Sequence, residues 1–232
     1  MKARKNKMIK RQEHEQILKS ILRDIYTNPG LQASLAFKEG TCLYLFYGLD
    51  IFSVDLDFNL RSDNFDDNKL NEIIKKHLQV TDRFNKHYTW FWLGGYEGDY
   101  QKIKVEVSKR DFPDKYIYKD FYGLTVPIMD PGYMFAHKLC AITDRKKLQS
   151  RDLYDARFMF NKRFEINEEI IKLRTGKTTK EYFAKLITFL EKKVTDNNIL
   201  EGLGELLTEQ QKNSVRATLK RDLLFDLKNR LN

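Results

Sequence analysis

The chain has 232 residues, enough to bury a sizeable hydrophobic core in one large domain or two small ones. Its 41% hydrophobic and 13% aromatic residues exclude an intrinsically disordered chain. The formal net charge of +9 favours a polyanionic partner, but it suits equally a basic protein that has no such partner.

Other features of the composition indicate where the protein works. No apolar run approaches the roughly 20 residues that a membrane-spanning helix needs. The basic segment 1–7 has no apolar stretch behind it, so it does not predict a signal peptide. Cys42 and Cys140 lie in apolar segments, which is typical of reduced thiols in a cytoplasmic core. The four histidines show no zinc-ligand spacing. We therefore expect a cytoplasmic protein without a membrane span.

The first predicted elements are a helix, a short strand and a second helix. Apolar residues recur at helical spacing over 10–27 and stop at Asn28-Pro29-Gly30, which predicts an amphipathic helix. The apolar piece 31–37 predicts a strand that leads into the turn Lys38-Glu39-Gly40-Thr41. The run 42–48 follows this turn and ends in a glycine, so it predicts a short helix with a glycine cap.

Residues 54–60 alternate strictly between apolar and polar side chains, which predicts a strand with one buried face. The apolar side chains are Val54, Leu56, Phe58 and Leu60, and the polar ones are Asp55, Asp57 and Asn59. The two carboxylates would lie roughly 6–7 Å apart on the open face. A helix N-terminus attracts phosphate, and paired aspartates can hold divalent cations over it, so the segment 36–60 indicates a phosphoryl-transfer site. Asp-x-Asp also occurs on solvated strand faces and Gly-Thr in simple helix caps, but their occurrence together favours the functional interpretation.

Beyond residue 60 the patterns predict more strands and then only helices. We expect a polar loop at 63–67, a surface helix at 67–78, a strand at 80–93, a loop around Gly94-Gly95 and Gly98-Asp99, an alternating strand at 101–108, one or two strands within 116–129, and helices at 133–144, from 151 onward and through 165–232. The turn Asp130-Pro131-Gly132 separates the two regions. The predicted fold class is therefore α/β (α+β), with a mixed-sheet domain at 1–130 that includes the N-terminal helix, and a helical domain at 131–232.

The segment 38–60 resembles the core of DNA polymerase β-like nucleotidyltransferases, and more closely the abortive-infection nucleotidyltransferase toxins of the AbiEii/AbiGii type. That family typically reads Lys-Gly-Gly-Thr-x-Leu and then Arg-Phe-Ser-x-Asp-Leu-Asp-Phe. This chain reads Lys38-Glu39-Gly40-Thr41-Cys42-Leu43 and Ile51-Phe52-Ser53-Val54-Asp55-Leu56-Asp57-Phe58. Glu39 replaces the usual glycine and Ile51 the usual arginine, and both departures would weaken phosphate binding. Lys-Leu-x-Ala, followed by Arg and Arg-Asp-Leu-Tyr-Asp, also matches the family, so the resemblance covers about residues 35–160.

The resemblance implies a metal-dependent nucleotidyltransferase with named site residues. Asp55, Asp57 and Glu106 would be catalytic and would hold Mg²⁺ or Mn²⁺, whereas on the sequence alone Glu106 is an exposed residue opposite a lysine pair. The implied nucleotide-binding residues are Lys38, Gly40, Thr41, Ser53, Lys138, Arg145 and Asp152; without the family, the last three would be interpreted as solvated charges. The implied donor is a nucleoside triphosphate (NTP), the acceptor is an RNA such as a tRNA 3′ end, and a cognate antitoxin is the implied protein partner.

Three other functions stay open at this point. A catalytically degenerate relative would bind RNA or a partner protein, and Glu39 and Ile51 favour it. A small-molecule nucleotidyltransferase would modify a hydroxylated drug. A structural helical module would carry Asp55 and Asp57 by chance. Metal-dependent NTP turnover separates the enzymes from the other two, and salt-sensitive RNA binding separates RNA acceptors from drugs, because phosphate contacts release counterions.

Overall fold

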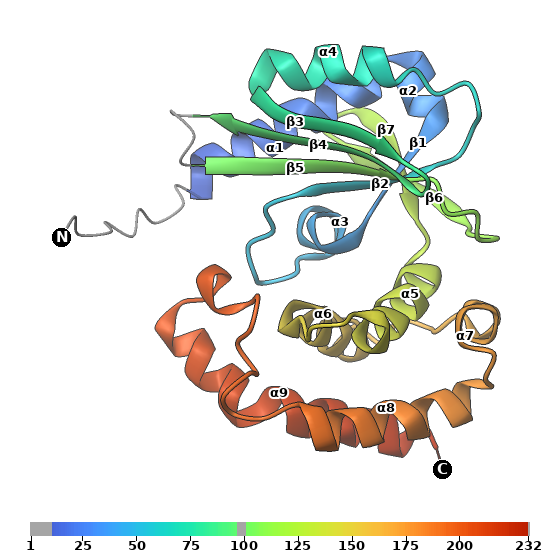
Figure 1. Cartoon of the computed structure of the whole chain (residues 1–232), viewed down its shortest axis with the longest axis vertical. Coiled ribbons are helices and arrows are strands. Elements are labelled where there is room, and N and C mark those ends of the chain that lie inside the picture. The colour runs from blue at the N-terminus through green and yellow to red at the C-terminus, as the bar shows by residue number, and fades with distance from the viewer. Residues whose placement is uncertain (1–10, 97–100, 232) are drawn as a thin grey trace. The chain divides into compact units, whose positions relative to one another are not determined.

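The computed structural model describes residues 11–96 and 101–231, and the chain divides into two compact units. The first lies within residues 11–48, 52–111 and 116–129, and the second within 49–51, 112–115 and 130–231. Figure 1 shows the sheet and helices of the first unit in blue to green and the helices of the second in yellow to red. The predicted α/β fold class, a mixed sheet followed by a helical C-terminal region, is confirmed. None of the helices in the described ranges is long and apolar enough to cross a membrane.

One mixed seven-stranded sheet forms the core of the first unit, in the order β3-β4-β5-β2-β1-β7-β6. The strands are β1 (Leu35–Lys38), β2 (Leu56–Leu60), β3 (Gln79–Lys86), β4 (Thr89–Tyr96), β5 (Gln101–Ser108), β6 (Tyr116–Phe121) and β7 (Leu124–Met129). β2 pairs antiparallel with β1 and parallel with β5, so it lies at the centre of the sheet. β3 and β6 are the two edges.

Four helices accompany this sheet: α1 (Arg11–Thr27), α2 (Pro29–Ser34), α3 (Glu39–Tyr47) and α4 (Asp67–His77). Figure 1 shows α1, α2 and α4 along one side of the sheet and α3 on the other. The strands contribute fully buried apolar side chains to the core, among them Leu56, Phe58, Trp92, Val105 and Val107. The predicted glycine cap is confirmed, because α3 ends at Gly48 with a φ of 74°, a left-handed conformation that glycine adopts without strain.

The strand predicted over 31–37 is wrong in its first half, where the chain forms α2. The Asn28 side chain accepts a hydrogen bond from the backbone N–H of Leu31, and Pro29 occupies the first helical turn. Both residues favour a helix start. The tripeptide that ends α1 therefore also begins the next helix, and only Leu35–Lys38 is extended.

The single strand predicted over 80–93 is a hairpin, because the chain turns at His87-Tyr88 between β3 and β4. Gly94-Gly95 lies inside β4 rather than in a loop. A Cβ on Gly94 would come within 2.8 Å of the Cβ of Leu78, so close packing requires glycine there. Gly98-Asp99 and the basic segment 1–7 lie outside the described residues.

The second unit is helical. Its helices are α5 (Pro131–Asp144), α6 (Ser150–Asn161), α7 (Glu168–Thr175), α8 (Thr179–Lys193) and α9 (Glu209–Asn229), with a short 3₁₀ helix, η1 (Gly204–Leu206). Thr178 and Thr208 form capping boxes that start α8 and α9.

Cys42 in α3 and Cys140 in α5 are free and buried, as expected. Burial raises the pKa of Cys140 to about 11 and that of Cys42 well above its usual value, so both thiols stay protonated.

Candidate active site

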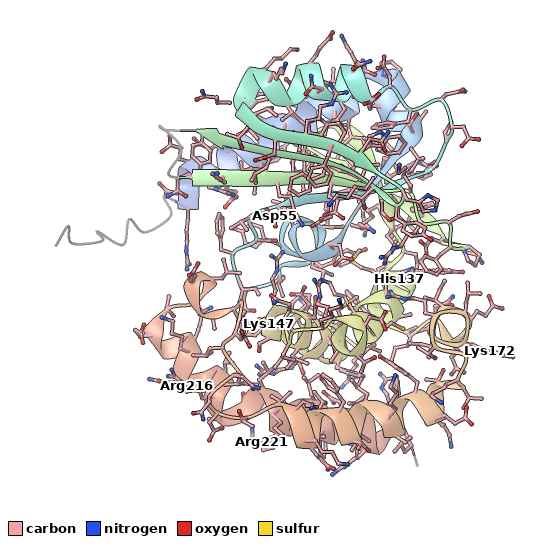
Figure 2. All side chains as sticks on the ribbon, in the orientation of Figure 1. Asp55, His137, Lys147, Lys172, Arg216 and Arg221 are labelled. Atoms are coloured by element: carbon pink, nitrogen blue, oxygen red, sulfur yellow. The ribbon has the colours of Figure 1, made fainter. Side chains whose placement is uncertain are left out.

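Three carboxylates meet at the centre of the sheet; we call Asp55, Asp57 and Glu106 the carboxylate cluster. In the parallel pairing of β2 with β5, Asp57 stands opposite Glu106, so both lie on the same face. Asp55 directly precedes β2, and its Oδ1 accepts a hydrogen bond from the backbone N–H of Lys104 at 3.2 Å. Figure 2 shows Asp55 on the side of the sheet where α3 lies. The neighbouring positions of β2 and β5 therefore bring the three predicted catalytic acids together.

The ammonium group of Lys104 lies among these acids. Its Nζ is 3.7 Å from Oδ2 of Asp55, 3.4 Å from Oδ1 of Asp57 and 3.4 Å from Oε2 of Glu106. Burial acts to lower the pKa of Lys104, but the three carboxylates together outweigh it and raise that pKa above its usual value. Lys104 was not among the predicted site residues. The available signal was its position two residues before Glu106, which puts both on one face of β5.

The start of α3 is fixed to the segment that carries Asp55. Lys38 stands opposite Asp57 in the pairing of β1 with β2 and is the N-cap residue of α3. Thr41 is buried; its hydroxyl donates a hydrogen bond to the carbonyl oxygen of Asp55 and lies 2.7 Å from Oγ of Ser53. The first turn of a helix has unpaired backbone N–H groups that attract phosphate. These contacts therefore join a potential phosphate-binding turn to the carboxylate cluster.

Glu39, the first residue of α3, has a φ of 66°. This left-handed conformation costs an L-amino acid with a side chain roughly 1–2 kcal/mol, whereas glycine adopts it freely. Glycine is also the residue that the family pattern has at this position. The backbone of this chain thus keeps the conformation that suits glycine, although the residue is glutamate.

His14 holds the loop that leads into β2. Its Nε2 lies 3.0 Å from the carbonyl oxygen of Val54, and its Nδ1 lies 2.6 Å from the hydroxyl of Tyr96. Burial is the largest influence on the ring and lowers the pKa of His14, which favours a neutral ring that donates to Val54 and accepts from Tyr96. Sequence reasoning considered the histidines only as zinc ligands. Nothing in the spacing of His14 and Val54 signals this positioning contact.

A second polar cluster brings Lys138, Arg145 and Asp152 together within the second unit. Lys138 is 4% exposed, and its Nζ lies 3.3 Å from Oδ1 of Asp152 and 2.9 Å from Oδ2 of Asp155. Nε of Arg145 lies 2.6 Å from Oδ2 of Asp152. Burial is the largest influence on Asp155 and raises its pKa, while Lys138 acts in the opposite direction. Lys138 is thus the central cation of this buried cluster, which belongs to a different unit from the carboxylate cluster.

Ile51, which stands where the family pattern has an arginine, belongs to the second unit and is 1% exposed. An arginine at so buried a position would have to lose its hydration, which is costly without a buried partner. The surroundings of this residue are therefore suited to an apolar side chain.

The carboxylate cluster has the chemistry of a site for a hard divalent cation. Carboxylate oxygens are the ligands that Mg²⁺ prefers in proteins. In the described ranges 11–96 and 101–231, no group of three or more His, Cys, Asp or Glu side chains has the arrangement of a metal site. In the carboxylate cluster the Lys104 ammonium stands in for the cation. The type of donor atom therefore suits a hard cation, but in this structure the Lys104 ammonium occupies the position among the three acids.

Comparisons with known proteins give a family and a fold. The family described as "Nucleotidyl transferase AbiEii toxin, Type IV TA system" matches residues 20–228. A candidate nucleotidyltransferase from Helicobacter pylori superposes with a TM-score of 0.58 at 19% sequence identity, covering 94% of this chain and 96% of that one. JHP933 from the same organism superposes with a TM-score of 0.56 at 18% identity, covering 95% and 94%. At these identities the two structures show a shared fold. No curated protein matches the chain.

Proposed function

Because the chain belongs to the AbiEii family of nucleotidyltransferase toxins from type IV toxin–antitoxin systems, we propose that it transfers a nucleotide from an NTP to an RNA acceptor, such as a tRNA 3′ end, with the help of divalent metal ions. The observation that carries this proposal is the meeting of Asp55, Asp57 and Glu106 on one face of the sheet, joined through Thr41 to the start of α3. A type IV system also implies a cognate antitoxin as a partner.

In the proposed mechanism, Asp55, Asp57 and Glu106 would hold Mg²⁺ or Mn²⁺, which when bound would neutralise phosphate charge and lower the pKa of the attacking hydroxyl. The backbone N–H groups at the start of α3, with Lys38 beside them, bind the β- and γ-phosphates. Glu106 accepts the proton of the acceptor hydroxyl, whose oxygen attacks the α-phosphorus. The bond from that phosphorus to the bridging oxygen breaks, and pyrophosphate leaves.

Lys138, Arg145 and Asp152, which all lie in the second unit, stay proposed nucleotide-binding residues. The side chain of Arg145 is 51% exposed, whereas those of Lys138 and Asp152 are both 4% exposed. Arg145 is therefore the member best able to contact a phosphate, and Asp152 orients it through the bond to its Nε. Lys138 in turn holds Asp152 in place.

The proposed function is tested by incubating the protein with total RNA, Mg²⁺ and each labelled NTP in turn. We expect label in RNA from at least one NTP, and no label after a chelator has removed the divalent ions. If no NTP labels RNA while the protein still binds RNA in a salt-sensitive manner, the chain is a binding protein and the proposed reaction is wrong.

RNA binding without nucleotide transfer is the second candidate function, and two observations favour it. The Lys104 ammonium takes the place of a cation in the carboxylate cluster. Glu39 adds a negative charge at the start of α3, where a phosphate would have to bind. Each observation leads to a substitution whose outcome distinguishes the two candidates.

Replacing Lys104 with methionine is expected to tighten Mn²⁺ binding to the NTP-free protein by roughly tenfold, equivalent to about 1.4 kcal/mol. The reason is that the tethered ammonium competes with the metal for the same three carboxylates. Calorimetric titration with Mn²⁺ measures the effect. Lys102→Met is the matched control, because Lys102 lies two residues away in β5 and is exposed. Unchanged or weaker Mn²⁺ binding in Lys104→Met would show that the ammonium does not compete.

Replacing Glu39 with glycine is expected to preserve or raise nucleotide transfer, and to leave the free energy of unfolding unchanged or raise it by up to about 1 kcal/mol. Glycine relieves the strain of the left-handed backbone and removes a charge that repels phosphate. Glu39→Ala separates these effects, since alanine removes the charge but keeps the strained Cβ. A sharp loss of Mg²⁺-dependent transfer in both variants would mean that the Glu39 carboxylate takes part in the chemistry.

A further inference from the structure

Two phenylalanine rings are stacked face to face on the outer strands of the sheet. Phe84 in β3 stands opposite Phe91 in β4, with ring centroids 4.3 Å apart and ring planes only 3° from parallel. Phe84 is 36% exposed, and Phe91 is partly exposed. Because the rings cover each other's inner faces, the aromatic face that the pair turns outward at the open edge of the sheet is the outer face of Phe84.

The register of the strands places this pair on the same face as the carboxylate cluster. Phe84 pairs with Phe91, Phe91 with Glu106, and Glu106 with Asp57. Residues directly opposite each other on neighbouring strands share a face, and neighbouring strands lie about 4.8 Å apart. Phe91 is therefore one strand away from Glu106, and Phe84 is two. That spacing is within the reach of a single nucleotide.

Positive charge lies beside the Phe84 ring and beside the hairpin turn of β3 and β4. Nζ of Lys86, two residues after Phe84 in the edge strand, is 4.4 Å from the centroid of the Phe84 ring. Beside the hairpin turn, the Arg110 guanidinium lies 5.8 Å from the ring centroid of Tyr88, which is 56% exposed. Asp82 is the acid that β3 places on the same face, opposite Leu93. Lys86 thus lies over the face of Phe84 that Phe91 does not cover, and Arg110 adjoins Tyr88 beside the hairpin turn.

We propose that Phe84, supported from behind by Phe91, forms a stacking platform for an unpaired base near the 3′ end of the acceptor RNA. The base extends the stack on the outer face of Phe84, and Lys86 moves from that face to a backbone phosphate. This inference rests on the proposed function and adds the recognition surface. Base–aromatic stacking tolerates any sequence, because every base has a flat face. An acceptor strand fits better than the base of the NTP, since all phosphates of an NTP lie together at the reacting centre. A cation beyond the rings matches a backbone that continues away from that centre.

The platform is tested by the binding of a fluorescent single-stranded oligoribonucleotide, measured by anisotropy without NTP and with a chelator present. Phe84→Ala and Phe91→Ala are each expected to weaken binding by roughly 5- to 150-fold. Phe84→Tyr should retain affinity, because tyrosine keeps the aromatic face. Phe84→Leu should lose affinity although it keeps an apolar side chain, and it guards against misfolding of the alanine variants. Lys86→Gln should lower the slope of log affinity against log salt by about 1.

Two controls define the site. Phe225→Ala removes another exposed phenylalanine, 65% exposed on α9, and should leave RNA affinity unchanged. An oligonucleotide without bases should bind the wild type and the phenylalanine variants equally. If folded Phe84→Leu and Phe91→Leu bind RNA as the wild type does, the pair only stabilises the sheet and the proposal is overturned. The same conclusion follows if these variants lose self-association rather than RNA binding.

Further measurements separate this proposal from the proposed function. Ring-dependent RNA binding without transfer from any NTP would support the platform and overturn the enzyme. Transfer to RNA with an unchanged acceptor KM in Phe84→Leu would support the enzyme and overturn the platform. A loss of NTP affinity with unchanged RNA affinity would assign the rings to the donor base, which also overturns the proposal.

Discussion

Replacing Asp57 with asparagine is expected to lower nucleotide transfer by at least roughly 100- to 1,000-fold, the loss typical when one charge-stabilising group is removed from a reacting centre. Asparagine has nearly the same shape but lacks the charge that would hold a divalent cation. The fold should survive, because three carboxylates share one ammonium in this cluster. Removing the charge of Asp57 ends its repulsion with the carboxylates of Asp55 and Glu106. We therefore expect an unchanged or slightly higher melting temperature.

The measurement is label transfer to RNA alongside thermal unfolding of the same preparation. Asp55→Asn should behave similarly, although it also weakens the bond from the Lys104 backbone N–H. Asp82→Asn is the matched control, because Asp82 is an exposed aspartate on another strand of the same sheet. If the melting temperature of Asp57→Asn collapses, the carboxylate is structural and the catalytic assignment is wrong.

Replacing Lys138 with methionine is expected to lower the free energy of unfolding by about 3–5 kcal/mol, the usual result of removing one partner from a buried ion pair. The ammonium lies close to two almost fully buried carboxylates, Asp152 and Asp155. Without Lys138, the buried charge of Asp155 would lose the cation that now opposes the effect of burial on its pKa. This expectation gives Lys138 a structural task in addition to the proposed one at the nucleotide.

Urea unfolding followed by far-ultraviolet circular dichroism measures this effect, since the second unit is helical. Both tryptophans lie in β4, so their fluorescence follows the first unit separately. Lys147→Met is the matched control: Lys147 is 74% exposed, and its loss should change stability by less than about 0.5 kcal/mol. Unchanged unfolding of Lys138→Met together with weaker NTP binding would mean that Lys138 serves the nucleotide and not the fold.

The parts of the fold with strong local signals were predictable from the sequence. The alternation over 54–60 and the glycine after residue 47 identified β2 and α3, because strand periodicity and a left-handed cap are local properties. The β3–β4 hairpin was missed because its turn, His87-Tyr88, contains none of the residues that usually mark a tight turn. α2 was missed because Asn28 and Pro29 were interpreted only as the end of one helix, although they also favour the start of the next.

The composition of the candidate site was less predictable, because it depends on which strands become neighbours. Asp55 and Asp57 stood out as a motif, but only the pairing of β2 with β5 puts Glu106 beside them. Lys104 was seen as an open-face residue, and nothing local indicates that its ammonium reaches all three acids. The burial of Lys138 was hidden for the same reason, since its partners lie on the following helix.

The central pairing of β2 with β5 determines when the carboxylate cluster can form while the chain is being synthesised. Asp55 and Lys104, which this pairing brings into contact, are separated by 49 residues, and the hairpin of β3 and β4 is made between them. Contacts of such separation form late, because a long stretch of chain must be ordered first. A ribosome that stops before β5 would therefore release a fragment with two aspartates but no assembled carboxylate cluster. Under the proposed function, such a fragment would lack transferase activity, and activity would appear only after β5 has paired with β2.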